Sequence, residues 1–448
     1  MAKRLPYFRT YDVRGTFPDE VNADLAYKLG RAVMVWSGAR EVIVGRDARL
    51  SSPSLAEALI DGLRAGGATV LDVGLATTPM LNFAVARWRR YGLMVTASHN
   101  PKEYNGVKVI DPGVEQVYYG RGLERLEELV VMQRFQAGAR RGGLRLRTIL
   151  PDYESAFAAR FRDSVRAAPP LVVDCSNGVG GLPLGALEAL GIAYTPLYHV
   201  PNGEFPNHGC DTLRAENLRD LQRAVTQQGA GLGVMFDGDA DRVAFVDERG
   251  EIGRLDYVFV LLARQALAGG GGRVFYDLRF SHAVKEEIEK QGGTAVTLRV
   301  GNPFHKEALH RHDDALLAAE LSGHIMYREH FGIDDPLYAT LKLLALLAQA
   351  GRGLAELLRT VPHYPGSGEL RIETRDPAAL VEKARAQFAD AAVNTIDGIT
   401  VEYSDWWFNL RPSNTEPVAK LVIEAALPEQ LARRQRELLA LFAGGEVG

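Results

Sequence analysis

The sequence predicts an α/β protein with three similar α/β units followed by a smaller α+β unit. The first observation is a strand–turn–helix order that occurs three times, at a spacing of about 100 to 130 residues. The second is a change of pattern near the C-terminus, where the segments are typical of an α+β unit. The third is the length, because 448 residues are too many for one hydrophobic core.

The repeated order begins each time with an apolar, β-branched run. A polar turn that contains Asp follows, and then a helical pattern that ends in glycine. The first copy is EVIVGRD with SSPSLAEALIDGLRAGG, whose helix we expect Ser51 or Ser52 to cap. The other copies are PPLVVDCSNGVGGLPLGALEALG and GRVFYDLRFSHAVKEEIEKQGG. Further strands are predicted at TVLDVG, AYTPLYHV and TAVTLRVG, so strands and helices alternate as in α/β sheets.

The last portion contains the strand-like segments YPGSGELRIET and ITVEYSDWWFNLRPSNTEPVAKLVIEA, then an arginine-rich helical stretch. HYPGSG is a plausible linker before it. The predicted domains are residues 1–147, 148–251, 252–362 and 363–448. In α/β units ligands bind where loops leave the carboxyl ends of strands, and the four most unusual loops of this sequence occupy such positions.

Composition excludes several classes of function. The net charge of −4 gives no support for binding nucleic acid. Two cysteines, Cys175 and Cys210, suit a reducing compartment, and we expect a cytoplasmic protein. The basic N-terminus is not followed by an apolar run, and no segment approaches the roughly 18 to 20 apolar residues of a membrane span. We therefore expect neither nucleic acid nor a membrane as partner.

The first motif, TASHNP, places Ser98 at the end of a strand-like run. A serine nucleophile or phosphate carrier must be held at a turn beside groups that handle protons and charge. His99 and Lys108 supply such groups, and Pro101 stiffens the exit of the turn. Taken alone, the motif is more typical of an ordinary turn or helix-capping serine.

The second motif is DGDADR, in which Asp237, Asp239 and Asp241 alternate on a turn after an apolar run. Alternate carboxylates on a turn can converge on one hard cation such as Mg²⁺ or Ca²⁺. A calcium EF-hand would need glycine where Arg242 stands, and helices on both sides. A solvated acidic turn is the remaining alternative. Arg242 could face a phosphate.

Two further motifs have polar side chains suited to a phosphosugar. In ELSGH, Glu320, Ser322 and His324 alternate, and an extended segment would place them on one face, where they could hold sugar hydroxyls. In RPSNTEP, a turn gathers donors for a phosphate group. Those donors are Arg411, Ser413, Asn414 and Thr415. The alternatives are a polar strand edge and a plain hairpin turn.

A weaker signal is YFRTYDVRG near the N-terminus, which taken alone predicts a solvated arm. It carries Arg9, Tyr11 and Arg14.

These motifs occur in the order found in the α-D-phosphohexomutase superfamily. The chain resembles its bacterial phosphomannomutase/phosphoglucomutase members over essentially its full length. YDVRG is similar to that family's YDIRG, TASHNP with YNGVK to its phosphoserine loop TGSHNP with YNGxK, and DGDADR to its magnesium loop DGDGDR. ELSGH resembles its sugar loop ExSGH, and RPSNTEP its phosphate loop RxSNTxP.

The resemblance implies four domains around a central cleft and a mutase, an intramolecular phosphotransferase of the isomerase class. It would interconvert hexose 1-phosphate and hexose 6-phosphate, mannose or glucose, through phosphorylated Ser98 and a hexose 1,6-bisphosphate. One Mg²⁺ per site would bind Asp237, Asp239, Asp241 and the phosphoserine, and glucose 1,6-bisphosphate would be the activator. The protein would be a monomer or a homodimer.

The resemblance also implies roles for single residues. Ser98, His99, Lys108 and Arg242 would act in catalysis. Substrate would bind Tyr11, Arg14, Arg279, Glu320, Ser322, His324, Arg411, Ser413, Asn414 and Thr415.

The sequence departs from the family pattern at a few positions. Ala97 and Ala240 replace glycines. Asn302 stands where members of this subgroup often have a histidine that assists proton transfer, and His305 or Lys108 would have to replace it. The alternatives are a phosphoglucosamine mutase, which Leu321 disfavours because that subgroup tends to have Asn there, a phosphatase, and a non-catalytic phosphosugar-binding protein.

Overall fold

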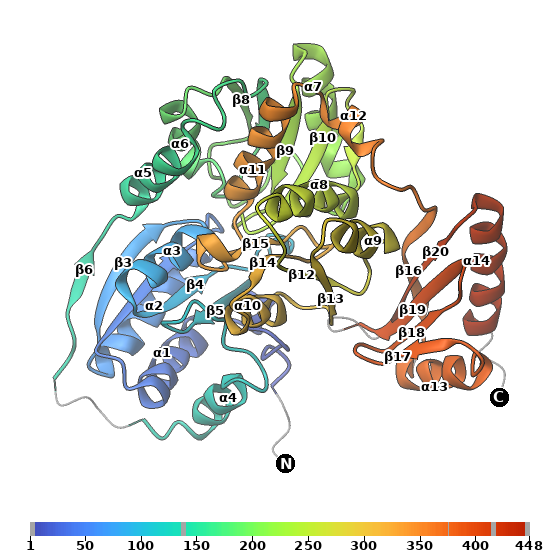
Figure 1. Ribbon diagram of the computed structural model, residues 1–448. Helices are drawn as coiled ribbons and strands as arrows, with labels where there is room; N and C mark the ends of the chain where they lie inside the picture. Colours follow the sequence, from blue (N-terminus) through green and yellow to red (C-terminus); the bar gives the residue numbers. More distant parts are fainter. Residues whose placement is uncertain (1–4, 136–139, 375, 414–417, 444–448) are drawn as a thin grey trace.

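The computed structural model describes residues 5–135, 140–374, 376–413 and 418–443. These residues form four β-sheets, each accompanied by helices, and Figure 1 shows them as four units in chain order. The three α/β domains and the α+β domain predicted from the sequence are therefore confirmed. No helix within the described ranges is long and apolar enough to cross a membrane.

The first domain has a mixed six-stranded sheet of order β1-β5-β4-β2-β3-β6. Apolar side chains of α1, α2 and α4 pack on one face of the sheet, and those of α3 pack on the other. The strands are β1 (Val13–Thr16), β2 (Glu41–Arg46), β3 (Thr69–Leu75), β4 (Tyr91–Val95), β5 (Tyr104–Ile110) and β6 (Leu144–Leu146). The helices are α1 (Ala23–Ser37), α2 (Ser52–Ala65), α3 (Thr78–Trp88) and α4 (Leu123–Met132).

The second domain has a five-stranded sheet of order β11-β10-β9-β7-β8. Its strands are β7 (Leu171–Asp174), β8 (Tyr194–Leu197), β9 (Leu232–Phe236), β10 (Val243–Asp247) and β11 (Ile252–Gly253). Its helices are α5 (Leu150–Phe161), α6 (Gly185–Ala189) and α7 (Arg219–Gln228), with 3₁₀ turns η1 (Leu182–Leu184) and η2 (Ala215–Leu218).

The third domain has a four-stranded sheet of order β13-β12-β14-β15. Its strands are β12 (Arg273–Asp277), β13 (Thr294–Leu298), β14 (Ala315–Ala319) and β15 (Ile325–Tyr327). Its helices are α8 (Leu255–Leu267), α9 (His282–Lys290), α10 (Asn302–Arg311), α11 (Pro336–Ala350) and α12 (Leu354–Leu358), with the 3₁₀ turn η3 (Arg328–His330). One apolar core joins α3, α5, α8 and α11 and so connects the first three domains.

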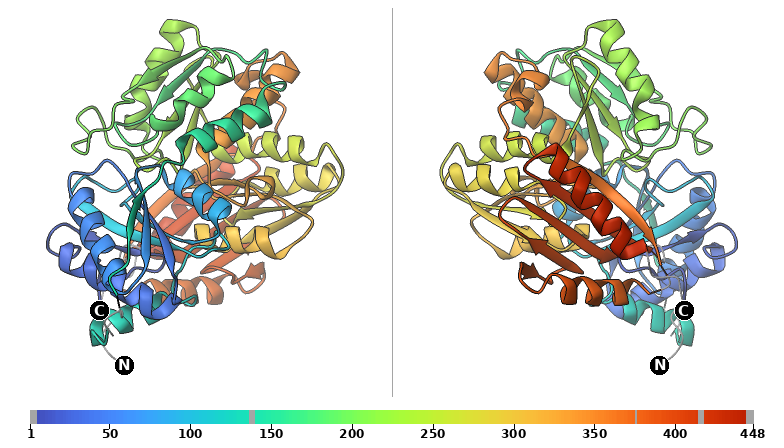
Figure 2. Two further views of the ribbon diagram at one scale, coloured as in Figure 1. Left: turned by 90° about the vertical axis from the view of Figure 1, so that its left-hand side faces the viewer. Right: turned by 90° about the vertical axis from the view of Figure 1, so that its right-hand side faces the viewer.

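The fourth domain has an antiparallel sheet of order β16-β20-β19-β18-β17. Its strands are β16 (Gly366–Glu373), β17 (Ala392–Asn394), β18 (Ile399–Glu402), β19 (Trp406–Pro412) and β20 (Val418–Ala425). Helices α13 (Pro377–Gln387) and α14 (Pro428–Ala443) pack on one face of it. Figure 2 shows α14 on the outer side, so the opposite face is turned towards the other domains.

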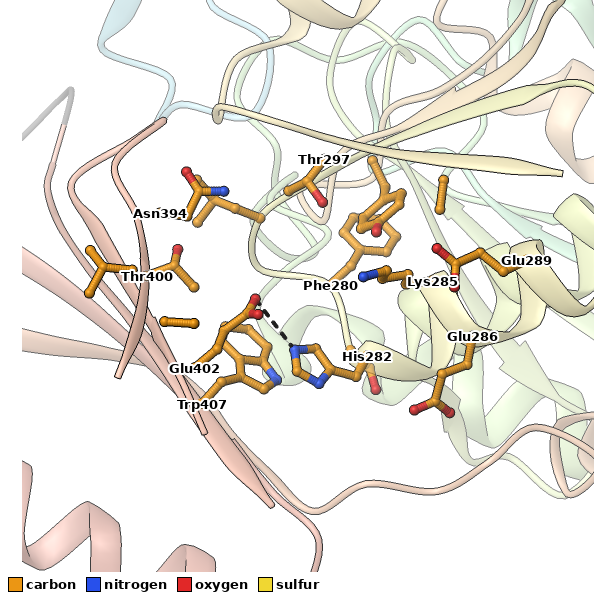
Figure 3. A pocket seen from close by; sticks show the side chains of 16 residues that line it. Phe280, His282, Lys285, Glu286, Glu289, Thr297, Asn394, Thr400, Glu402 and Trp407 are labelled. Carbon is orange, nitrogen blue, oxygen red and sulfur yellow. Dashed lines mark ion pairs between the residues drawn. The ribbon is translucent and has the colours of Figure 1, made fainter. Parts of the chain in front are cut away.

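Contacts between the third and fourth domains surround a cavity of about 510 Å³. Figure 3 shows that α9 and strand β13 line it on one side and β17 to β19 on the other. At its floor the His282 ring stacks on Trp407 at 5.3 Å, and the imidazole lies 3.8 Å from Glu402. The buried Glu424 carboxylate accepts hydrogen bonds from the His282 backbone N–H and the Trp407 indole, both at 2.9 Å. These contacts tie the fourth domain to the third.

Two local predictions differ from the structure. Ser51 precedes α2, but its hydroxyl makes no capping bond and instead accepts a hydrogen bond from the Asn105 amide at 2.7 Å. The helix expected in SNGVGGLPLGALEALG is reduced to η1 and the short α6. The glycines explain this, because a side chain at Gly178 would lie 2.4 Å from the Gly238 carbonyl, and one at Gly181 2.1 Å from that of His199. Close backbone approach replaces helix there.

Candidate active site

A cavity of about 330 Å³ lies where the four domains meet. The first domain contributes the N-terminal segment and the turn after β4, and the second contributes the turn after β9. The third contributes the loops after β12, β13 and β14, and the fourth contributes β16, β19 and β20. The predicted site residues that line it are Tyr11, Arg14, Ser98, His99, Lys108, Asp241, Arg242, Arg279, Glu320, Ser322, His324, Arg411 and Ser413.

Ser98 lies on the turn between β4 and β5 and has a left-handed backbone conformation, with φ of 50°. Such a conformation is uncommon for a residue other than glycine. The turn is fixed by the Ser98 backbone N–H, which donates to the Thr96 hydroxyl at 2.9 Å. The Ser98 hydroxyl donates to Asp237 Oδ2 at 2.6 Å, so the first and second domains meet at this atom. Ser98 is therefore held in place by Thr96 and Asp237 and is not merely exposed on a loop.

Hydrogen bonds from Arg49 hold the serine turn in place, and sequence reasoning missed this residue. Its fully buried guanidinium donates to the carbonyls of Ser98, Asn100, Pro101 and Tyr104 at 2.6 to 3.0 Å. Asp47 accepts from Arg49 Nε at 3.0 Å. Both residues follow strand β2 in GRDAR, but nothing in that spacing shows that they reach a turn fifty positions later.

The three carboxylates of the turn after β9 converge. Oxygens of Asp237, Asp239 and Asp241 lie within 4.8 Å of one another, and all three residues are buried. Among the described residues, Asp239 Oδ1 and Asp241 Oδ1 have no hydrogen-bond partner. Clustered buried carboxylates with unused oxygens favour a hard divalent cation, so the residues present fit Mg²⁺.

Lys108 on β5 points at the same carboxylates. Its ammonium lies 2.7 Å from Asp239 Oδ2 and also donates to Asp241 Oδ2. Burial opposes the charged form of Lys108, but the two carboxylates outweigh burial and raise its pKa above the ordinary value. Burial also raises the pKa of Asp237, with the charges of Asp241 and Asp239 adding to the effect. The cluster thus contains the Lys108 ammonium, which is hard to deprotonate, and the Asp237 carboxyl, which is hard to ionise.

His99 lies beside the serine hydroxyl, and Arg242 lies beside Asp241 of the acidic turn. His99 Nδ1 is 3.3 Å from the Ser98 hydroxyl, and burial together with Arg242 and Arg14 lowers the pKa of this imidazole far below its ordinary value. His99 is therefore neutral. Arg242 lines the cavity, and its Nε is buried, lies 3.9 Å from Asp241 Oδ1 and makes no hydrogen bond within the described ranges.

The predicted sugar-binding residues form a turn between β14 and β15, so the extended segment expected from their alternation is not observed. The turn closes through the Glu320 N–H, which donates to the His324 carbonyl at 2.9 Å. His324 Nδ1 lies 3.1 Å from Glu320 and 2.9 Å from the Ser322 hydroxyl, so the three groups still cluster. Burial opposes protonation of His324, but Asp241 and Glu320 raise its pKa to about 9.

Arg279, Arg411 and Ser413 lie on the other side of the cavity. Arg279 follows β12 and forms a forked pair with Asp277, at 3.0 and 2.6 Å. Arg411 and Ser413 lie at the end of β19, in the hairpin to β20. Asn414 and Thr415 lie outside the described residues. Sequence reasoning missed several residues of the cavity, among them Glu369 on β16 and Lys420 on β20.

The N-terminal segment is not the solvated arm that its composition alone suggests. The Tyr11 hydroxyl donates to the Val300 carbonyl at 2.8 Å, which joins the first and third domains. Arg14 pairs with Asp12 at 2.6 Å and donates to the Asn100 side chain at 2.8 Å.

Asn302 and His305 have different surroundings. Asn302 begins α10, lines the cavity and donates from its amide to Asp334. His305 is buried, its Nδ1 lies 3.1 Å from the Gly301 carbonyl, and it does not line the cavity. His305 is therefore poorly placed to replace a histidine at position 302.

Family models of phosphoglucomutase/phosphomannomutase match the chain in four consecutive parts. The model of α/β/α domain I matches residues 5–117, that of domain II residues 152–250, that of domain III residues 254–364, and that of the C-terminal domain residues 369–441. These matches cover most of the chain and follow the order of the four sheets.

Relatives of similar length support the same assignment. A protein of Xanthomonas campestris named "Phosphohexose mutases" is 35% identical over 450 residues, covering 98% of this chain and 100% of the relative. A phosphomannomutase/phosphoglucomutase of Pseudomonas aeruginosa is 36% identical over 439 residues, covering 95% and 93%. A crystal structure of a family protein from Burkholderia thailandensis superimposes with a TM-score of 0.91 at 34% identity, covering 99% and 98%. The chain belongs to the phosphoglucomutase/phosphomannomutase family.

Proposed function

We propose that the protein is a phosphohexomutase that interconverts hexose 1-phosphates and hexose 6-phosphates through a phosphorylated Ser98. The observation that carries this proposal is the position of the Ser98 hydroxyl, 2.6 Å from the carboxylate cluster and facing a cavity lined by all four domains. A phosphoryl carrier needs charge neutralisation on one side and room for an acceptor on the other. The named relatives are mutases of this kind.

Mg²⁺ would be held by Asp237, Asp239 and Asp241, together with an oxygen of phosphorylated Ser98. When bound, the ion would neutralise negative charge on the transferring phosphoryl group. Lys108 contacts two of the three carboxylates. Its positive charge would offset part of their negative charge, and its contacts would hold their orientation. Arg242, whose Nε makes no hydrogen bond to any described residue, would add a second positive charge at the phosphoryl oxygens.

In the first step a free sugar hydroxyl attacks the phosphorus carried by Ser98. The bond from phosphorus to Ser98 Oγ breaks, and a bond to the sugar oxygen forms. The proton of the sugar hydroxyl leaves, and one proton returns to Ser98 Oγ. His99 Nδ1 lies 3.3 Å from Oγ, and the Lys108 ammonium contacts the carboxylate cluster beside it, so position makes these two residues the candidates for proton transfer. The amide side chain of Asn302 cannot accept or donate a proton in catalysis near neutral pH.

The 1,6-bisphosphate formed in this way must turn so that its other phosphate reaches Ser98. Arg411 and Ser413 would hold the phosphate that is not reacting, together with Asn414 and Thr415 by resemblance and with help from Tyr11 and Arg14. Arg279 would be a further basic residue that binds substrate. Glu320, Ser322 and His324 would bind sugar hydroxyls in both orientations. Exclusion of water by closure of the four domains would favour transfer over hydrolysis.

The preferred substrates are glucose and mannose phosphates, because Leu321 occupies the position where glucosamine-specific members tend to have Asn. We further propose one Mg²⁺ per site, activation by glucose 1,6-bisphosphate, a cytoplasmic location, and a monomer or homodimer. We also propose that the four domains comprise residues 1–147, 148–251, 252–362 and 363–448.

A phosphorus NMR time course tests this function. The purified protein is incubated with equal amounts of glucose, mannose and glucosamine 1-phosphates, Mg²⁺ and a trace of glucose 1,6-bisphosphate. We expect glucose and mannose 6-phosphates to appear, and Ser98→Ala to abolish them without unfolding the protein. Conversion of the glucosamine ester alone would identify a phosphoglucosamine mutase, and release of inorganic phosphate a phosphatase. An unchanged spectrum with folded, phosphorylated protein would indicate a non-catalytic phosphosugar-binding protein.

A further inference from the structure

The carboxylate of Glu369 lies where three cations of the cavity converge. Its Oε2 is 2.7 Å from the Arg411 guanidinium and 3.5 Å from that of Arg279, and its Oε1 is 3.4 Å from the Lys420 ammonium. Arg279 belongs to the third domain, and the other three residues belong to neighbouring strands of the fourth. Glu369 therefore pairs with Arg411 and Arg279, which are proposed to bind the phosphate that does not react, and with Lys420.

The Glu369 side chain lines the cavity and is not buried inside the fourth domain. Its side chain is 28% exposed, whereas those of Arg279 and Arg411 are only 7% and 6% exposed. Burial disfavours its ionised form, but Arg279, Arg411 and Lys420 outweigh burial and lower its pKa below the ordinary value. Glu369 is thus an anion held at the edge of the cleft by two almost completely buried arginines and by Lys420, whose side chain is 21% exposed.

The cations can bind more than this one carboxylate. Arg411 Nε is buried and, in the part of the chain that the structure describes, has no hydrogen-bond partner. A phosphate monoester presents about two negative charges and three acceptor oxygens near neutral pH, against one charge and two oxygens for a carboxylate. A phosphate can therefore replace Glu369 at Arg411 and Lys420 and satisfy donors that the carboxylate leaves unused.

We propose that Glu369 is an internal counter-anion of the phosphate subsite, which competes with the substrate's phosphate for Arg411 and Lys420. The proposal rests on the proposed function in that the competing ligand is the phosphate of a hexose phosphate. Between turnovers Glu369 offsets part of the positive charge of Arg411 and Lys420, and a bound phosphate displaces it.

This competition serves the turning of the bisphosphate. Leaving buried cations without a counter-charge is costly, so a site with no internal anion would release phosphate slowly. With Glu369 the departing phosphate is exchanged for a carboxylate and not for an empty site. Binding that is equally strong in ground state and transition state adds nothing to turnover, so weaker ground-state binding here costs little.

Glu369 also connects two loops that must act together. Its partner Arg279 is held by Asp277, whose Oδ2 accepts the Leu321 backbone N–H at 2.8 Å. Arg279 also lies 3.7 Å from Glu320 of the sugar-binding turn. When phosphate displaces Glu369, Arg279 would lose one of its carboxylate contacts. Because Arg279 also lies near Glu320, the change would reach the turn that carries the sugar-binding residues.

Equilibrium binding of inorganic phosphate tests the proposal without any turnover. Dephosphorylated protein is titrated calorimetrically with phosphate at low ionic strength, as wild type and as Glu369→Gln. We expect the variant to bind phosphate at least about fivefold more tightly, because one competing charge is removed while an oxygen acceptor for Arg411 is kept. Glu369→Asp, which retains the charge, should stay closer to wild type, and Glu369→Ala should also bind more tightly.

The matched control is Glu373→Gln, on the same strand, because Glu373 is 75% exposed and pairs only with Arg371 among the contacts of the described residues. Its phosphate affinity should equal that of wild type. The gain in Glu369→Gln should disappear in the double variant with Arg411→Gln, which locates it at this subsite. Unchanged or weaker phosphate binding by folded Glu369→Gln would overturn the proposal, since a merely structural carboxylate would weaken the site when neutralised.

The outcome is independent of mutase activity. If Glu369→Gln binds phosphate more tightly but the wild-type protein converts no hexose phosphate, the proposed function fails and the counter-anion role stands. If the wild-type protein is an active mutase and phosphate affinity does not rise in the variant, only the counter-anion role fails.

Discussion

Ser98 shows how single side chains make this site from atoms that are far apart in the sequence. Its hydroxyl contacts Asp237, its carbonyl contacts Arg49, and its backbone N–H contacts Thr96. None of these contacts is exposed to bulk water, since the side chains involved are buried. Charge inside such a site acts more strongly than at a surface, so the effect of each substitution should be large.

Asp239→Asn should weaken the metal site. Asp239 has one oxygen on Lys108 and Thr78 and another without a partner in the described chain, which leaves it free for a cation. Replacing the charged oxygen pair with an amide should raise the Mg²⁺ concentration that gives half-maximal activity by about tenfold or more. A Mg²⁺ titration of the mutase rate after treatment with EDTA measures this. Asp163→Asn, at an 87% exposed carboxylate, should leave the titration unchanged. An equal Mg²⁺ requirement in both variants would contradict the assignment.

Arg49→Met should destabilise the protein and the serine turn together. The substitution removes the partner of Asp47 and the donors to four carbonyls of the turn. Removing one member of a buried ion pair costs about 3 to 5 kcal/mol in free energy of unfolding. Urea denaturation measures the loss. Arg90→Met, which breaks the exposed pair with Glu41, should cost less than about 1 kcal/mol. Similar losses in the two variants would show that the buried position of Arg49 is unimportant.

At the scale of the elements, local patterns predicted the strands well and the turns only in part. EVIVGRD and TVLDVG are strands as expected, because apolar β-branched runs need only a sheet and a core to bury them. The triad Asp237, Asp239 and Asp241 was predictable, because all its members lie on one turn.

Long-range contacts could not be predicted from the same patterns. The roles of Arg49 and Glu369 depend on partners in other elements, and nothing near them in the chain indicates those partners. The short α6 and the turn at Glu320 depend likewise on close packing against other segments.

Gly301→Ala should disturb the junction between β13 and α10. Gly301 has φ of 138°, and an added Cβ would lie 2.5 Å from the Tyr11 hydroxyl. Tyr11 must then move from its bond to Val300, so we expect KM for hexose 1-phosphate to rise about tenfold, with a smaller change in kcat. Steady-state kinetics measure both. Gly351→Ala serves as control, because its φ is also positive but no atom lies within 4 Å of an added Cβ. A KM equal to that of the control would exclude this role for Tyr11.

At the scale of the whole molecule, the site exists only where domains meet. Ser98 joins the first and second domains, Tyr11 joins the first and third, and Glu369 joins the fourth and third. The phosphate and sugar subsites therefore depend on contacts outside the cavity that fix the domains relative to one another. The contact between the first and third domains contains ionisable groups and so should depend on pH.

Glu115 is one of the carboxylates of that contact, and Glu307 is another. Its Oε1 lies 3.2 Å from His310 Nδ1 of α10, and Arg121 pairs with both Glu115 and Glu307. The hydrogen bond from His310 lowers the pKa of Glu115, burial opposes this, and Arg121 lowers it further. Because the folded-state pKa is depressed, Glu115 contributes stability above its ordinary pKa of 4.5, and the contribution is lost as pH falls through the folded value.

Glu115→Gln should therefore reduce the acid sensitivity of the fold. We expect the free energy of unfolding to fall less between about pH 6 and about pH 3 in the variant than in the wild type, since the variant has no carboxylate to protonate there. Urea denaturation at both pH values gives the two differences. Glu57→Gln, at an exposed position of α2, should keep the wild-type difference. If Glu115→Gln and Glu57→Gln lose equal stability over this range, Glu115 does not link the first and third domains, and the domain arrangement around the cavity is held by the apolar core that α3, α5 and α11 share.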